Sequence, residues 1–193
     1  MLQWLGDQAD TVFYNAARPS GEYLGVVQDL ASGSTREVPM PLANVARDGS
    51  CGVSINFDRV FDFRPGYGYC QKRDPWFGEK HSIGDGVWLV DIPEASAKQV
   101  LTMDGIWDAM KHGFDGADAK ICINHITLNP AADRFVLLAR NFREGDVNRW
   151  ATTVFVSDLA GNLSAPLYDA CMASHYWWSG DTTLVFFAGG PEG

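Results

Sequence analysis

Residues 124–141 read NHITLNPAADRFVLLARN, and this stretch decides the fold that the sequence predicts. A short run, 124–128, passes through an Asn-Pro turn into a second run, 134–141. Within it, Phe135 to Ala139 are apolar at every position, which is typical of a strand buried on both faces. Two further segments follow at 152–159 and 166–168, separated by the turn Gly161-Asn162. The pattern predicts four antiparallel strands in succession.

The same succession recurs along the chain with a period of roughly 40 to 50 residues. The predicted strands are 2–5, 11–15, 23–30 and 35–39 in the first copy, 43–46, 51–57, 86–92 and 98–102 in the second, and 175–178 and 183–188 in a shortened fourth. A four-stranded meander of this length matches a propeller blade. We therefore predict an all-β fold, a partial β-propeller of about three and a half blades. A β-sandwich of short strands is the alternative.

Residues 1–193 are predicted to form a single partial propeller domain, interrupted by insertions at 58–84 and 103–120. The first insertion is too long for a hairpin loop, so it is either a functional loop or a disordered one. In the second, Asp104 is a candidate N-cap, and the helical spacing of apolar residues predicts one short helix that ends near Gly113. Loops gather at the ends of a propeller, so both insertions are expected over the central funnel.

Bulk composition excludes several classes of function. A formal net charge of −9 would repel the phosphate backbone, so no nucleic-acid partner is predicted. The four cysteines lie far apart without zinc-site spacing, and we predict no metal and no cofactor. No signal peptide or long apolar stretch is seen, so no membrane partner is predicted. The expected location is cytoplasmic by default, or periplasmic if the N-terminus is truncated.

Two stretches are locally basic although the whole chain is acidic. One lies between Asp58 and Arg73 and includes Arg64, and the other includes Arg140 and Arg143. Arginine suits two-pronged contact with carboxylate or sulfate, so the two stretches together predict a site for an anionic ligand. The alternative is ordinary solvated charge and ion pairs within the chain.

Two histidines and two tyrosines are further candidates. His125 and His175 occupy equivalent places on the first strands of adjacent blades, which would bring the imidazoles toward each other in the channel. A neutral imidazole can act as a general base, but structural histidines are an equal alternative. Tyr67 and Tyr69 lie in a loop framed by proline and glycine, where they either project outward or pack down to close the apolar edge.

Several short motifs carry a resemblance to a known family. They are Leu2-Gln-Trp4, Val12-Phe-Tyr-Asn15, Ser54-Ile-Asn-Phe57, Arg64-Pro-Gly-Tyr-Gly-Tyr69, Asn124-His-Ile126, Arg134-Phe135 and Ser174-His-Tyr-Trp177. In this order the chain resembles bacterial seven-bladed propellers akin to oligogalacturonide lyases and ulvan lyases. Relatives that use a metal hold it with several histidines, which cannot be matched here. An arginine that has His and Trp neighbours in that family stands here between Ala139 and Asn141.

The resemblance implies β-elimination on a uronic-acid glycan, with an anionic oligosaccharide or polysaccharide as the partner. A base removes a proton, a cation neutralises the carboxylate, and an acid protonates the leaving oxygen. The implied roles are His125 as base, Arg140 or Arg143 as neutraliser and His175 or Tyr69 as acid. The residues expected to bind substrate are Arg64, Tyr67, Asn124 and Arg143.

Two other functions stay open at this point. A non-catalytic propeller that binds glycan or protein would use the same fold, since propellers serve both uses. An inactive, truncated product would leave strand edges unpaired, and self-association through those open edges would follow.

Overall fold

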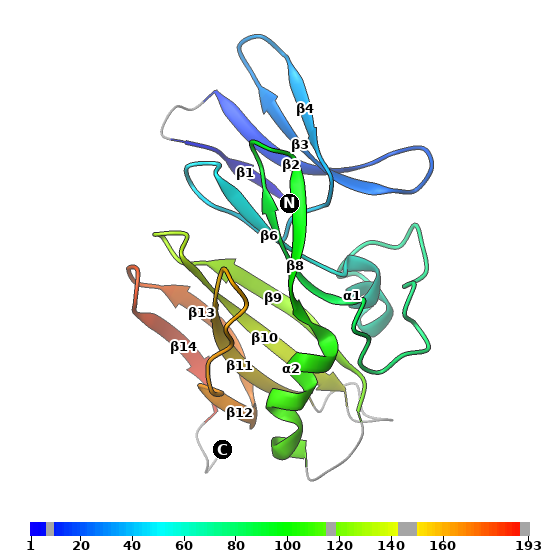
Figure 1. The fold of residues 1–193 in the computed structure, drawn as a ribbon, viewed down its shortest axis with the longest axis vertical. Helices are drawn as coiled ribbons and strands as arrows, with labels where there is room; N and C mark the ends of the chain where they lie inside the picture. The colour runs from blue at the N-terminus through cyan, green and yellow to red at the C-terminus, as the bar shows by residue number, and fades with distance from the viewer. Residues whose placement is uncertain (7–9, 115–118, 143–149, 190–193) are drawn as a thin grey trace.

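The computed structural model describes residues 1–6, 10–114, 119–142 and 150–189, which form successive antiparallel sheets and two α-helices (Figure 1). The first sheet contains β1 (Leu2–Trp4), β2 (Thr11–Ala17), β3 (Tyr23–Asp29) and β4 (Thr35–Val38). The second contains β5 (Asn44–Val45), β6 (Cys51–Ile55), β7 (Gly86–Asp91) and β8 (Ser96–Thr102). The third contains β9 (Ile121–Leu128), β10 (Arg134–Phe142), β11 (Trp150–Asp158) and β12 (Tyr168–Cys171), and β13 (Ala173–Trp178) pairs with β14 (Leu184–Ala188).

The predicted partial β-propeller is confirmed, because every sheet is a meander whose strands pair in chain order. The sheets pack face to face through apolar clusters. Phe13 of the first sheet lies with Val90 of the second, Ile55 of the second lies with Phe135 of the third, and Val136 of the third packs against Phe186 of the last. Burial on both faces explains the continuous apolar run of β10.

Asparagine side chains join one sheet to the next. The amide of Asn15 donates to the carbonyl of Leu42 and accepts from its N–H, both at 2.8 Å. Asn44 accepts from the N–H of Leu128 at 2.9 Å. These bonds satisfy backbone groups at the starts and ends of neighbouring strands, so they fix how adjacent blades are stacked.

The first insertion begins as a helix, where the sequence predicted only a strand end and a loop. Helix α1 (Phe57–Phe63) starts at the N-cap Asn56, whose side chain accepts from the N–H of Arg59 at 3.1 Å. Asp58 lies in the first turn, where a negative charge favours the helix dipole. The rest of the insertion is a loop beside α1 that returns to β7 (Figure 1).

Arg59 anchors this insertion from inside the protein. Its side chain is 1% exposed and lies 3.4 Å from the Asp74 carboxylate and 3.3 Å from that of Asp85. Its guanidinium also donates to the carbonyls of Ile121 at 2.7 Å and Lys80 at 2.5 Å. The bond to Ile121 ties the insertion to the first strand of the third sheet, and so positions α1 beside that sheet.

The predicted short helix in the second insertion is present as α2 (Met103–Met110), followed by the 3-10 turn η1 (Lys111–Phe114). Its N-cap is Thr102, which accepts from the N–H of Gly105 at 3.0 Å, and Asp104 lies in the first turn instead. Met103, Ile106 and Met110 are buried against the second and third sheets. In the described part of the chain, no helix is long and apolar enough to cross a membrane.

Candidate functional site

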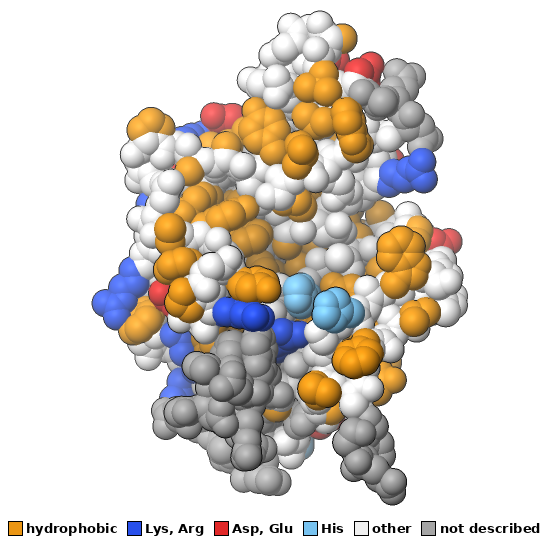
Figure 2. Space-filling model, turned by 180° about the vertical axis from the view of Figure 1, so that it is seen from behind, with side chains coloured by type: hydrophobic (Ala, Val, Ile, Leu, Met, Phe, Trp, Pro, Cys, Tyr) orange, Lys and Arg blue, Asp and Glu red, His pale blue; other side chains and the backbone are white. Residues whose placement is uncertain are grey.

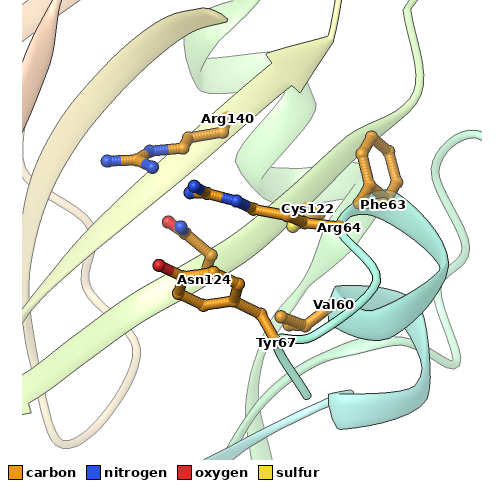
Figure 3. A pocket seen from close by; sticks show the side chains of 7 residues that line it. All are labelled: Val60, Phe63, Arg64, Tyr67, Cys122, Asn124 and Arg140. Atoms are coloured by element: carbon orange, nitrogen blue, oxygen red, sulfur yellow. The ribbon is translucent and has the colours of Figure 1, made fainter. Parts of the chain in front are cut away.

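A narrow pocket opens between α1 and the third sheet. It is small, with a cavity volume of about 10 Å³, and is lined by Val60, Phe63, Arg64, Tyr67, Cys122, Asn124 and Arg140. Figure 3 shows the guanidinium groups of Arg64 and Arg140 extending in the same direction above the ring of Tyr67 and the amide of Asn124. Four of the residues proposed from the sequence therefore line one pocket, and each basic stretch contributes one of its arginines.

The two arginines reach the pocket from separate elements. Arg64 is the C-cap of α1, and its guanidinium carbon lies 4.2 Å from the centroid of the Tyr67 ring. Arg140 lies on β10, is 5% exposed and donates through Nη2 to the carbonyl of Ala173 at 3.2 Å. Burial lowers the pKa of Arg140, and the positive charge of Arg64 lowers it further. An anion between the guanidiniums would relieve this repulsion.

A β-bulge places Asn124 at the pocket. Leu138 pairs with His125, but the next residue, Ala139, pairs with Ile123, so Asn124 is an extra residue in β9. Bulges of this kind redirect side chains and are common beside functional sites. The side-chain oxygen of Asn124 is buried and has no hydrogen-bond partner within the described ranges. It is available to accept a hydrogen bond from a ligand.

His125 adds a weakly basic group close to the two arginines of the pocket. Although part of its side chain is open to solvent, burial lowers its pKa to about 4, helped by the positive charges of Arg140, His175 and Arg64. Figure 2 shows histidine side chains beside basic ones on a face that is otherwise mainly uncharged. His125 on β9 and His175 on β13 are close enough for their charges to interact. At neutral pH His125 is uncharged.

His175 has a hydroxyl neighbour. The Oγ of Ser174 lies 3.0 Å from its Nδ1, and both residues are on β13. The two residues are adjacent in sequence, and the contact is exposed. It orients the imidazole without enclosing it.

Of the two tyrosines in the loop, one projects outward and the other packs down. Tyr67 is 45% exposed and faces Arg64, whereas Tyr69 packs down between Tyr23 and Phe57 at centroid distances of 4.5 and 4.6 Å. Burial raises the pKa of Tyr69, and its hydroxyl accepts from Asn15 at 2.7 Å. Tyr69 is therefore mainly a packing residue.

Gly68 lets the loop approach the helix. Its φ is +73°, and a Cβ there would collide with the carbonyl oxygen of Phe57. The neighbouring N–H of Tyr69 donates to that same oxygen at 3.2 Å. A side chain at position 68 would thus push Tyr67 and Tyr69 away from α1.

A wider cleft adjoins the pocket and shares Val60, Tyr67 and Asn124 with it. Its volume is about 260 Å³, and its lining adds Tyr69, His125 and Tyr176. Tyr176 was not among the residues proposed from the sequence. Its hydroxyl accepts from Thr127 at 3.2 Å, and burial raises its pKa to about 12. Its place beside His175 on an inner strand was the only signal that could have indicated it.

Other basic residues of the two stretches form ion pairs within the chain, as the alternative interpretation predicted. Arg59 is in the buried cluster with Asp74, and Arg134 pairs with Asp133 at 3.0 Å on the surface. Arg143 lies outside the described residues. Within the described ranges, no three His, Cys, Asp or Glu side chains are grouped to hold a metal ion.

No protein-family model and no curated protein matches the chain. Solved structures do. Tricorn protease matches 94% of this chain with 10% identity and a TM-score of 0.56, and the matched part is 14% of that protein. Pyrococcus horikoshii acylaminoacyl peptidase matches 93% of this chain with 18% identity and a TM-score of 0.51, over 26% of its own length. The β-propeller domain of the Trilobed protease from Pyrococcus furiosus matches 93%, with 16% identity and a TM-score of 0.48.

These comparisons correct the family resemblance drawn from the sequence. The structural neighbours are peptidase and protease propellers, and oligogalacturonide and ulvan lyases are not among them. The proposed lyase activity, with polysaccharide degradation, is therefore wrong. The roles of base, neutraliser and acid belonged to that activity, whereas the assignment of His125, Arg140, Arg143, His175 and Tyr69 to a site stays a prediction. At identities this low the likeness shows the fold alone: the chain has the fold of a partial β-propeller. It spans 14% of tricorn protease and 26% of the acylaminoacyl peptidase.

Proposed function

We propose that this chain is a binding module that holds a peptide by a carboxylate group, in the pocket between α1 and the third sheet. The observation that carries the proposal is the convergence of the Arg64 and Arg140 guanidiniums on one narrow pocket. Guanidinium groups bind carboxylates through two parallel, charge-assisted hydrogen bonds. Burial is the main cause of the lowered pKa of Arg140, and the positive charge of Arg64 adds to it, so an anion beside the two guanidiniums would stabilise their charged forms.

A peptide is proposed as the carrier of the carboxylate for two reasons. The similar structures include a protease and a peptidase. In addition, the buried side-chain oxygen of Asn124 offers an acceptor beside the arginines. A C-terminal residue presents a carboxylate next to an amide N–H, so it would satisfy both features. The adjoining cleft of about 260 Å³ would then accommodate the preceding residues.

Isothermal titration calorimetry tests this with matched ligands. N-acetyl-alanyl-alanine as the free acid should bind about ten-fold or more tightly than its C-terminal amide, since a hydrogen bond to a charged group contributes about 1.5–3 kcal/mol. R64Q should remove this preference. R134Q, which changes an exposed arginine that pairs with Asp133, should keep it.

Two results would contradict the proposal. Equal affinity for acid and amide would show that no carboxylate site exists. Tighter binding of galacturonic acid than of the peptide acid, lost in R64Q, would keep the anion site and refute the peptide. R64Q is preferred over R140Q because Arg140 is buried and its loss could affect folding.

A further inference from the structure

A second cavity lies on the other side of α1, between the first and second sheets. It has a cavity volume of about 270 Å³ and shares no lining residue with the arginine pocket. Its wall combines aromatic rings from four separate segments with charged side chains: Tyr23, Phe57, Trp76, Trp88, Asp58 and Lys72. An aromatic ring has a negative face and a positive edge, so ring faces that line such a space stabilise a cation.

The charged groups of this wall favour a positive ligand. Glu22 also lines the cavity, but it pairs with Arg18 at 2.7 Å. Asp58 is different, because its Oδ1 is buried and has no hydrogen-bond partner in the part of the chain that the structure describes. A buried carboxylate oxygen in this state is stabilised by a cation or a donor.

The environment of Asp58 agrees with this. Burial raises the pKa of Asp58, and the negative charges of Asp74 and Asp62 raise it further. Lys72 acts in the opposite direction and is the basic residue of the wall. The local potential therefore attracts positive charge, although the pocket on the other side of α1 attracts negative charge.

We propose that this cavity is a binding site for an alkylammonium group, held by the Asp58 carboxylate among the rings of Tyr23, Phe57, Trp76 and Trp88. Aromatic faces with a carboxylate are the recurring means by which proteins bind ammonium ligands. The volume suits a lysine side chain or a small free amine, which share this chemistry. Lys72 competes for the same carboxylate, so it sets the affinity. The site stands independently of the peptide carboxylate pocket.

Tryptophan fluorescence provides the readout, because Trp76 and Trp88 line the cavity. n-Butylammonium should bind and change the emission, whereas the neutral n-pentanol of similar size should bind at least ten-fold more weakly. Two further ligands distinguish the source of the ammonium group. Tighter binding of Nα-acetyl-lysine methylamide would identify a peptide side chain, and tighter binding of choline would identify a free amine.

Three variants decide the assignment. D58N should lower the affinity for n-butylammonium at least ten-fold, and K72M should raise it several-fold. E94Q removes one negative charge at an exposed turn and should leave the affinity unchanged. Damage to the fold would lower the affinity, so the rise in affinity expected for K72M cannot arise from it. Equal binding of n-butylammonium and n-pentanol, or no change in K72M, would overturn the proposal.

Discussion

Replacing Arg59 by methionine should destabilise the protein by about 3–5 kcal/mol at pH 7.5, the cost of leaving buried charges without their partner. The side chain is 1% exposed and faces two fully buried carboxylates, Asp74 and Asp85. R59M would also leave the carbonyls of Ile121 and Lys80 without their donor. A domain of this size has about 5–15 kcal/mol of stability, so the loss would be a large part of the total.

The loss should depend on pH in a definite direction. Burial already raises the pKa of Asp85 to about 6 in the presence of Arg59, and removing that positive charge would raise the pKa further. A carboxyl whose pKa is raised on folding contributes stability at low pH, which is lost as the pH rises through the folded-state value. R59M should therefore be less damaging at pH 5 than at pH 7.5.

Urea unfolding at the two pH values measures both effects. The triple variant R59M/D74N/D85N should recover part of the stability, because it removes the unpaired charges along with the arginine. R134M is the matched control and should cost less than about 1 kcal/mol, since its ion pair is exposed. A cost for R59M below about 1 kcal/mol, or one that is equal at both pH values, would refute this account of the buried cluster.

Three further predictions concern the neighbourhood of the arginine pocket. The imidazole of His125 should titrate near pH 4 by NMR, and R140Q should raise this value because it removes a like charge; an unchanged titration would contradict the proposed coupling. G68A should destabilise the protein by about 3 kcal/mol and weaken ligand binding, because a Cβ at this position would meet backbone atoms. G66A, which is also at positive φ but in open space, should cost about 1 kcal/mol. Equal losses of stability in thermal unfolding would disprove the role of the close approach of Gly68 to α1. Burial raises the pKa of Cys122 to about 12, so Cys122 should react with a thiol reagent only after unfolding, while the exposed Cys70 reacts at once. Rapid labelling of all thiols would show that the arginine pocket is more open than described.

Much of the fold could be predicted from the sequence because the blades depend on local apolar runs. The second strand of the third blade was predicted at 134–141 and is Arg134–Phe142. The outermost strand of that blade was predicted at 166–168 but is Tyr168–Cys171, because an outer strand has few buried positions to mark it. Helix α1 was missed because its seven residues are too short for helical periodicity, although Asn56 and Asp58 supply a start signal.

The residues of the candidate site were partly predictable and its chemistry was not. Clustering of arginines along the chain brought Arg64 and Arg140 forward, and the propeller topology then placed them together. The same stretches also supplied Arg59 and Arg134 to ion pairs, which composition cannot distinguish from ligand-binding residues. Separating them requires tertiary contacts.

The lyase resemblance failed for a related reason. Several of its motif residues have structural roles: Phe135 is fully buried and Ile126 is 3% exposed, so both pack the sheets together. Such residues recur wherever blades are stacked, whatever the protein binds or catalyses. Motifs of this kind therefore report the architecture, and activity must be read from the residues that line the pockets.

Because of the bulge in β9, the pocket can change in evolution without a change in the blade. Deleting Asn124 would leave the pairing of Ile123 with Ala139 and of His125 with Leu138 as a continuous ladder. A one-codon deletion would thus erase a pocket wall while keeping the sheet, and a one-codon insertion could create it again. In a repeat architecture, such single-residue gains let copies of one blade acquire different ligands without any blade having to be rebuilt.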